Sequence, residues 1–144
     1  MKNILVAIDF DESLEILVKQ AKRFANAFEA KIWLMHVAAP DPDFVGYNVG
    51  PQYIRDSRAD ELWEEHKIIQ KYTDQLHNQG CDAEGLLIQG ATIEMIIKES
   101  KKLKVEMIIA GHHERGFMYN AFVGSVSAQI IKNSKIPVLI VPFE

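Results

Sequence analysis

The chain opens with five apolar residues, Ile4-Leu5-Val6-Ala7-Ile8, and the acidic residue Asp9 ends the run. A continuous apolar run rich in β-branched side chains is typical of a parallel strand that helices cover on both faces. Residues 32–37, Ile-Trp-Leu-Met-His-Val, repeat this pattern, and further apolar segments follow at residues 83–88, 105–110 and 136–141. The opening run therefore predicts the central strand of a parallel sheet with five strands.

Amphipathic helical patterns separate the predicted strands. Asp11 or Ser13 is placed to cap a first helix, and the apolar residues of this helix recur at three- and four-residue spacing as far as Phe28. This spacing predicts that one side of the helix packs on the sheet.

The later helices follow the same logic. Residues 58–78 predict a second helix with a buried stripe that includes His66, and Gly80 stands where its C-cap belongs. Thr92 is placed to cap a third helix, and residues 126–133 predict the last one. Strands that alternate with helices indicate right-handed crossovers and a doubly wound, Rossmann-like α/β fold. We predict the strand order 3-2-1-4-5.

Composition and charge place the chain among ordinary globular proteins. It has 144 residues, of which 48% are hydrophobic and 25% charged, and these proportions predict a single domain over residues 1–144. The formal net charge of −4 lacks the positive excess that binding to a phosphate backbone needs, so we expect no nucleic-acid partner. The single cysteine, Cys81, suits a reducing compartment such as the cytoplasm, and the opening apolar run is too short to span a membrane.

Ligands of an open parallel sheet bind beyond the carboxyl ends of the strands, where the strand order reverses. In the predicted order this point lies between the first and fourth strands, so Asp9 meets the segment from Gly111 to Ser127 there. In Gly124-Ser125-Val126-Ser127, the glycine permits close backbone approach, and helix N-terminal amides and two hydroxyls can bind a phosphate. The segment predicts an anion site, although Gly-Ser at a helix start is also a common cap without a ligand.

These residues resemble the universal stress protein family over essentially the whole chain. The resemblance lies in the opening strand that ends in Asp9, the second strand that ends in His36-Val37, the spacing from Gly111 to Gly124-Ser125, and the closing Pro-Val-Leu-Ile-Val-Pro strand. It implies a fold like that of the adenine nucleotide alpha hydrolases.

The resemblance also implies a ligand, ATP or AMP, with or without Mg²⁺. Asp9 and Val37 would line the adenosine pocket, and the residues around Gly111 and the last helix would hold ribose and phosphates. The implied nucleotide-binding residues are Asp9, Val37, Ala110, Gly111, His113, Gly124, Ser125, Val126 and Ser127.

One position departs from the family pattern. The ATP-binding motif has a second glycine three residues after Gly111, where this sequence has Glu114. A carboxylate about 5 Å from phosphate oxygens would repel them by roughly 3 kcal/mol per charge pair at an effective dielectric constant near 20. Glu114 would then weaken ATP binding, unless its side chain points to solvent or helps to hold Mg²⁺. AMP, adenosine or no nucleotide stay open as alternatives.

Other chemical motifs each lack a required part. The loop from Gly111 to Gly116 copies the first half of a P-loop without its Lys and Ser or Thr, and no GxGxxG follows the first strand. His112 and His113 point in opposite directions in an extended segment, and no second cluster at metal-ligand spacing supports them. Cys81 has no identifiable base, so it is interpreted as a packing residue.

The closing strand, from Ile136 to Val141, is an edge strand in the predicted order and is apolar apart from its proline. A free edge exposes unpaired backbone groups, so we expect antiparallel pairing with a second copy, a homodimer that the family resemblance also implies. In the alternative, Pro137 and Pro142 blunt the edge of a monomer.

The leading interpretation is a cytoplasmic, homodimeric stress-response protein that binds or senses an adenine nucleotide without fast turnover. The alternative is an interaction module of the same fold whose nucleotide site has lapsed at Glu114, and slow ATP hydrolysis is a third possibility. Residues 41–56 form a loop long enough to be functional, but their role is not specified by the sequence.

Overall fold

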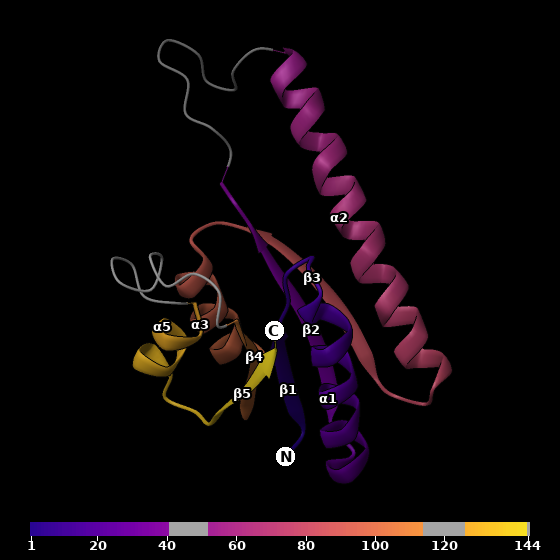
Figure 1. Cartoon of the computed structure of the whole chain (residues 1–144), viewed down its shortest axis with the longest axis vertical. Coiled ribbons are helices and arrows are strands. Elements are labelled where there is room, and N and C mark those ends of the chain that lie inside the picture. The colour runs from indigo at the N-terminus through magenta and orange to yellow at the C-terminus, as the bar shows by residue number, and fades with distance from the viewer. Residues whose placement is uncertain (41–51, 114–125, 144) are drawn as a thin grey trace.

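The computed structural model describes residues 1–40, 52–113 and 126–143 (Figure 1). Within them, five parallel strands form one sheet in the order β3-β2-β1-β4-β5, which confirms the predicted order. The strands are β1 (Asn3–Ala7), β2 (Lys31–Ala38), β3 (Ala83–Gln89), β4 (Met107–His113) and β5 (Val138–Phe143). Ile4, Leu5 and Val6 of the central strand are fully buried, as a strand covered on both faces must be.

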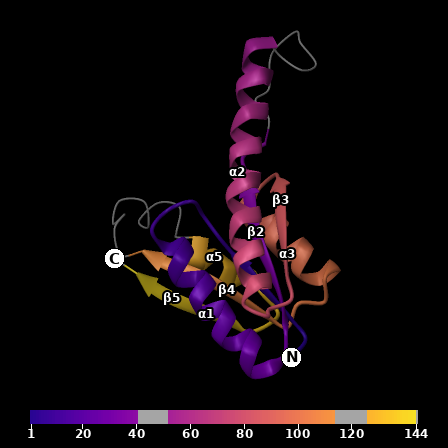
Figure 2. The ribbon, with the colours of Figure 1, turned by 90° about the vertical axis from the view of Figure 1, so that its right-hand side faces the viewer.

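The helices pack in two layers. They are α1 (Ser13–Phe28), α2 (Gln52–Asn78), α3 (Thr92–Lys102) and α5 (Val126–Asn133). Leu17 of α1 and Ile69 of α2 belong to the core on one face of the sheet, whereas Ile96 of α3 and Ile130 of α5 belong to the core on the other face (Figure 2). None of the described helices is long and apolar enough to cross a bilayer.

Helix α2 begins six residues earlier than predicted, and the buried residues among those whose burial is described lie in its C-terminal half. Its buried residues are Ile69, Thr73 and Leu76, and its N-terminal half extends past the carboxyl ends of the strands (Figures 1 and 2). His66, predicted on the inner stripe, is exposed, and the neighbouring Glu65 is half-buried instead. The predicted C-cap is confirmed, because Gly80 has a φ of +84° and donates its amide to the carbonyl of His77.

The helix starts follow the sequence in part in one case and depart from it in another. Asp11 Oδ1 accepts the backbone amide of Ser13, the first residue of α1, at 2.8 Å, although Glu12 and not Asp11 stands at the N-cap position of that helix. Thr92 is the first residue of α3 and not its cap; Ala91 precedes it with no side-chain hydrogen bond. Helix α3 therefore begins without a capping hydroxyl, and the prediction that Thr92 caps it is wrong.

One boundary and one burial prediction also need correction. Strand β5 begins at Val138, two residues later than predicted, because Ser134 Oγ forms hydrogen bonds with the amide and the carbonyl of Ile136 and holds that residue in a turn. Phe28, predicted on the buried side of α1, is 49% exposed because it lies in the last turn, and it stacks on Phe24 there.

Candidate functional site

A cavity of about 420 Å³ opens at the carboxyl ends of β1, β2 and β4. Six of the nine predicted site residues line it: Asp9, Val37, Ala110, Gly111, Val126 and Ser127. His113 is the last residue of β4, and Gly124 and Ser125 lie outside the described residues, as Glu114 does. The structure thus brings six of the seven described residues of the predicted site together at the point where the strand order reverses.

The floor of the cavity is apolar and is built from small side chains. Ala7 and Ala110 are directly opposite each other in the register of β1 and β4, so no large side chain fills the space above them. Met35 and Val37 of β2 and Ile96 of α3 complete the apolar wall. Such a wall fits a flat, weakly polar ring, and the polar groups lie at its margins. The sequence reasoning did not single out Ala7, although its place beside Ala110 follows from the sheet order.

The helix termini give the cavity a polar end. The first residues of α5, Val126 and Ser127, lie on its lining, and helix N-terminal amides attract negative charge. At α1, by contrast, the carboxylate of Asp11 already accepts the amide of Ser13, so an acidic side chain of the chain itself occupies that terminus. An anionic ligand is therefore favoured at α5 and disfavoured at α1.

Ser127 and His112 are paired beside the cavity. Ser127 is 4% exposed, and its Oγ lies 3.3 Å from His112 Nδ1, within hydrogen-bond distance. The pair places His112 on the α5 side of the sheet. Among the described residues, no three His, Cys, Asp or Glu side chains come close enough to hold a metal ion.

The absence of a side chain at Gly111 leaves space for the ring of Phe143, a contact that the sequence did not indicate. A Cβ atom on Gly111 would lie 2.8 Å from Cε1 of Phe143 and 3.6 Å from Cδ1 of Leu17. Residue 111 faces the α1 side of the sheet, and the ring of Phe143 needs the space that a side chain would take. The family resemblance implies that Gly111 helps to hold the ribose and phosphates, and the contact observed for it is with the end of β5.

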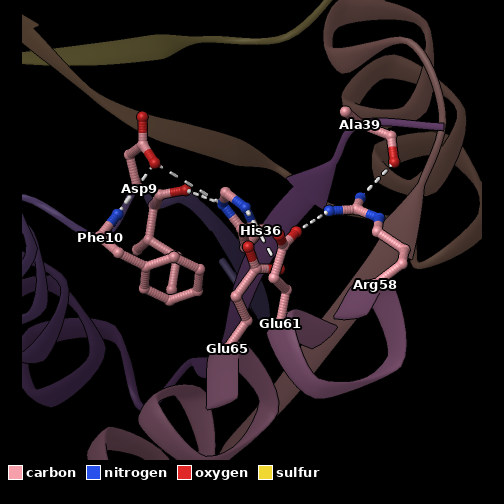
Figure 3. Close-up of polar contacts among 8 residues, drawn as sticks. Asp9, Phe10, His36, Ala39, Arg58, Glu61 and Glu65 are labelled. Atoms are coloured by element: carbon pink, nitrogen blue, oxygen red, sulfur yellow. Dashed lines mark hydrogen bonds and ion pairs between the residues drawn. The ribbon is translucent and has the colours of Figure 1, made fainter. Parts of the chain in front are cut away.

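Asp9 stands at the exit of β1 with its side chain 75% exposed. Its Oδ1 accepts the amide of Phe10 at 2.9 Å, which holds the carboxylate within the turn (Figure 3). His36 Nδ1 lies 3.0 Å from the carbonyl oxygen of Ile8 and 4.0 Å from Asp9 Oδ1. The turn that carries Asp9 is therefore tied to the end of β2.

Fold and cavity together define a Rossmann-like protein with an open cavity at the switch point of its sheet. Residues 1–142 match the sequence profile of the universal stress protein family. The chain belongs to this family.

Individual relatives agree with that assignment. Universal stress protein MJ0577 of Methanocaldococcus jannaschii is 27% identical over 152 residues, which cover 97% of this chain and 94% of the relative. A solved structure of MJ0577 superposes with a TM-score of 0.81 at 26% identity, over 99% of this chain and 96% of that one.

Two more distant structures share the fold. A universal stress protein in complex with cAMP has a TM-score of 0.75 at 20% identity and covers 98% of this chain and 96% of its own. A universal stress protein family protein of Arabidopsis thaliana with AMP bound has a TM-score of 0.67 at 19% identity, over 100% and 93% of the two chains.

Proposed function

We propose that this chain binds an adenine nucleotide, AMP or ATP, in the cavity between Asp9 and the start of α5. The observation that carries the proposal is the convergence of an acidic side chain, an apolar floor and a helix N-terminus on one opening of about 420 Å³. Family membership supports it, and so do the ligands of two relatives, cAMP and AMP.

The residues suggest how each part of the ligand is held. The adenine ring lies on the wall formed by Ala7, Val37 and Ala110, because these side chains are apolar and leave space. Asp9 accepts hydrogen bonds from the ribose hydroxyls, and the amides that open α5, with the hydroxyl of Ser127, bind the phosphate.

The number of phosphates is the finer part of the proposal. AMP places one phosphate at α5, whereas ATP carries two more. Glu114 stands in the sequence where the family's ATP-binding motif has a glycine, and a carboxylate near the additional phosphates would repel them. AMP is therefore the preferred ligand, and Glu114→Gly is expected to raise the affinity for ATP more than the affinity for AMP. If Glu114→Gly leaves the affinity for ATP unchanged, Glu114 does not weaken ATP binding.

Mass spectrometry of small molecules released from the purified, acid-precipitated protein tests the function. We expect an adenine nucleotide to be recovered. Thermal unfolding with added AMP or ATP, with and without Mg²⁺, gives a second readout, because a ligand at 100 times its Kd stabilises the folded state by roughly 2.7 kcal/mol. If no nucleotide is released and no adenine nucleotide shifts the unfolding temperature, the proposal is rejected in favour of an interaction module. Formation of ADP from added ATP would show that the protein also hydrolyses ATP slowly.

A homodimer through β5 is the second part of the proposal. In the described sheet β5 is an edge strand, and an open apolar groove of about 420 Å³ lies between it and α1. Phe24 and Phe28 line this groove together with Leu139 and Ile140. Pairing with a second copy would use the free backbone edge and cover these side chains.

Sedimentation equilibrium tests the dimer. We expect a dimer for the wild-type chain and a shift to monomer for Phe28→Asp, because a carboxylate in the groove must be desolvated on association. Trp63→Asp is a matched control, since Trp63 is an exposed aromatic on the distant part of α2. A monomeric wild-type chain, or a dimer that Phe28→Asp leaves intact, would contradict this interface.

A further inference from the structure

His36 lies where three elements meet, and its two ring nitrogens face different partners (Figure 3). Nδ1 is 3.0 Å from the carbonyl oxygen of Ile8, directly before Asp9. Nε2 is 3.9 Å from Oε2 of Glu65 on α2. The ring also packs on Phe10, with 4.3 Å between the ring centroids. The imidazole thus connects the end of β2, the turn that follows β1, and α2.

Glu65 is the unusual member of this group. Its Oε2 atom is buried and has no hydrogen-bond partner among the described residues, and the separation of 3.9 Å from His36 is too long for a hydrogen bond. A buried acceptor without a donor destabilises the fold. The sequence reasoning missed Glu65, since it placed His66 and not Glu65 on the inner stripe of α2.

The protonation state of His36 decides whether this acceptor finds a donor. A carbonyl oxygen can only accept a hydrogen bond, so Nδ1 must donate to Ile8 and carries the proton. In the neutral ring Nε2 then carries a lone pair. Two acceptors face each other in that state. When the ring is protonated, Nε2 carries a hydrogen and the ring a positive charge 3.9 Å from the unpartnered oxygen of Glu65, so the contact becomes an ion pair, which a closer approach of the two side chains converts into a charge-assisted hydrogen bond.

We propose that His36 is a positioning residue for the nucleotide cavity: through Ile8 it holds the turn that carries Asp9, and when protonated it joins this turn to Glu65 of α2. The inference rests on the proposed function, because Asp9 is the ligand contact that it positions. AMP affinity is therefore expected to increase as the pH falls through the range in which histidine becomes protonated.

The other charged groups around the ring are compatible with this link. From the turn after β1, Asp9 faces Nδ1 at 4.0 Å, but its high exposure leaves it strongly screened by water. On α2, Glu61 is paired with Arg58 at 2.9 Å, and Arg58 also donates to the carbonyl of Ala39. Among the described residues, Glu65 is thus the carboxylate that faces Nε2.

Three substitutions separate the link from a general effect of charge. Glu65→Ala removes the acceptor. Glu65→Gln offers an amide that donates to the lone pair of neutral Nε2, so it makes the link independent of pH. Glu64→Gln is the matched control, because it removes the same charge one residue away, where Glu64 pairs with Lys67 and does not touch His36.

The AMP dissociation constant is measured by calorimetry for all four proteins at about pH 6 and about pH 8. The phosphate of AMP titrates in this range, but this effect is the same for every protein and cancels in ratios of dissociation constants. We expect the advantage of wild type over Glu65→Ala to be at least about fivefold larger at the lower pH. Glu65→Gln should bind more tightly than wild type at the higher pH, and Glu64→Gln should follow wild type.

A pH profile of Glu65→Ala that coincides with the wild-type profile would overturn the inference. If no protein binds AMP, the proposed function fails, and the link is then decided by NMR of the ligand-free protein. There we expect the ring protons of His36 and the backbone amides of Asp9 and Glu65 to shift together with pH in wild type, and the Asp9 response to shrink in Glu65→Ala. Amides that stay unmoved while the ring titrates would contradict the link.

Discussion

At the scale of single residues, the site depends on side chains that are small or absent. Ala7 and Ala110 leave the cavity open, and Gly111 leaves room for Phe143 on the opposite face of the sheet. The sequence indicated Gly111 through its place before a predicted phosphate loop. Its contact with Phe143 could not be predicted, because it depends on how the end of β5 packs against β4.

Gly111→Ala is expected to destabilise the protein by about 1–3 kcal/mol, since the new methyl group overlaps the ring of Phe143. Urea denaturation measures the loss. In the background of Phe143→Ala the same substitution should cost clearly less, because the ring that it meets is gone. Equal costs in both backgrounds would show that the glycine serves some other purpose, such as ligand approach.

Glu106 gives a pH dependence with a defined sign. The backbone amide of Lys2 donates to its carboxylate and lowers the pKa of Glu106 below its ordinary value, and the N-terminal ammonium 3.8 Å away acts in the same direction. The folded-state pKa lies below the unfolded-state pKa, so the ionised carboxylate stabilises the fold at neutral pH. This contribution is lost as the pH falls through the folded-state pKa.

The stability of Glu106→Gln should therefore fall below that of wild type at neutral pH, and the two curves should converge in acid. Urea denaturation over a pH series provides the measurement. Asp82→Asn is the control, an exposed carboxylate that precedes β3. A difference between wild type and Glu106→Gln that stays constant with pH would contradict the assigned cause.

At the scale of elements, α2 is the part that the sequence describes least well. Its C-terminal half packs on the sheet and carries an apolar stripe, so residues 58–78 were recognisable as a helix. Its N-terminal half buries little surface, so no apolar period marks the start at Gln52. The polar contacts of Arg58 and Glu65 replace an apolar stripe there, and such contacts leave no periodic signal.

Close packing of α2 on β3 depends on Gly85. A Cβ atom at this position would lie 2.3 Å from Cγ2 of Ile69 and 3.1 Å from Oγ1 of Thr73. Gly85→Ala should therefore push α2 away from the sheet and destabilise the protein by about 2 kcal/mol or more. Adding Ile69→Ala should recover part of the loss, measured by a double-mutant cycle. Simple additivity of the two changes would argue against this contact.

At the scale of the whole molecule, the sequence predicts the sheet and the place of the cavity. The alternation of apolar strands and amphipathic helices leads to the order β3-β2-β1-β4-β5, and this order brings Asp9, Val37 and Ala110 to one edge. Once this strand order is chosen, connectivity and handedness rules locate the cavity. They do not identify Glu65 or Phe143, because these residues reach their positions through side-chain packing.

Binding of AMP to the purified chain, measured by isothermal titration calorimetry, tests the central claim most directly. We predict saturable binding at one site per chain that Asp9→Ala weakens at least about tenfold, as loss of a hydrogen bond to a charged group does. Asp74→Asn, a change of an exposed carboxylate on α2, should leave the affinity unchanged. A folded wild-type protein that gives no saturable AMP binding, or an Asp9→Ala variant that binds as tightly as wild type, would contradict the account.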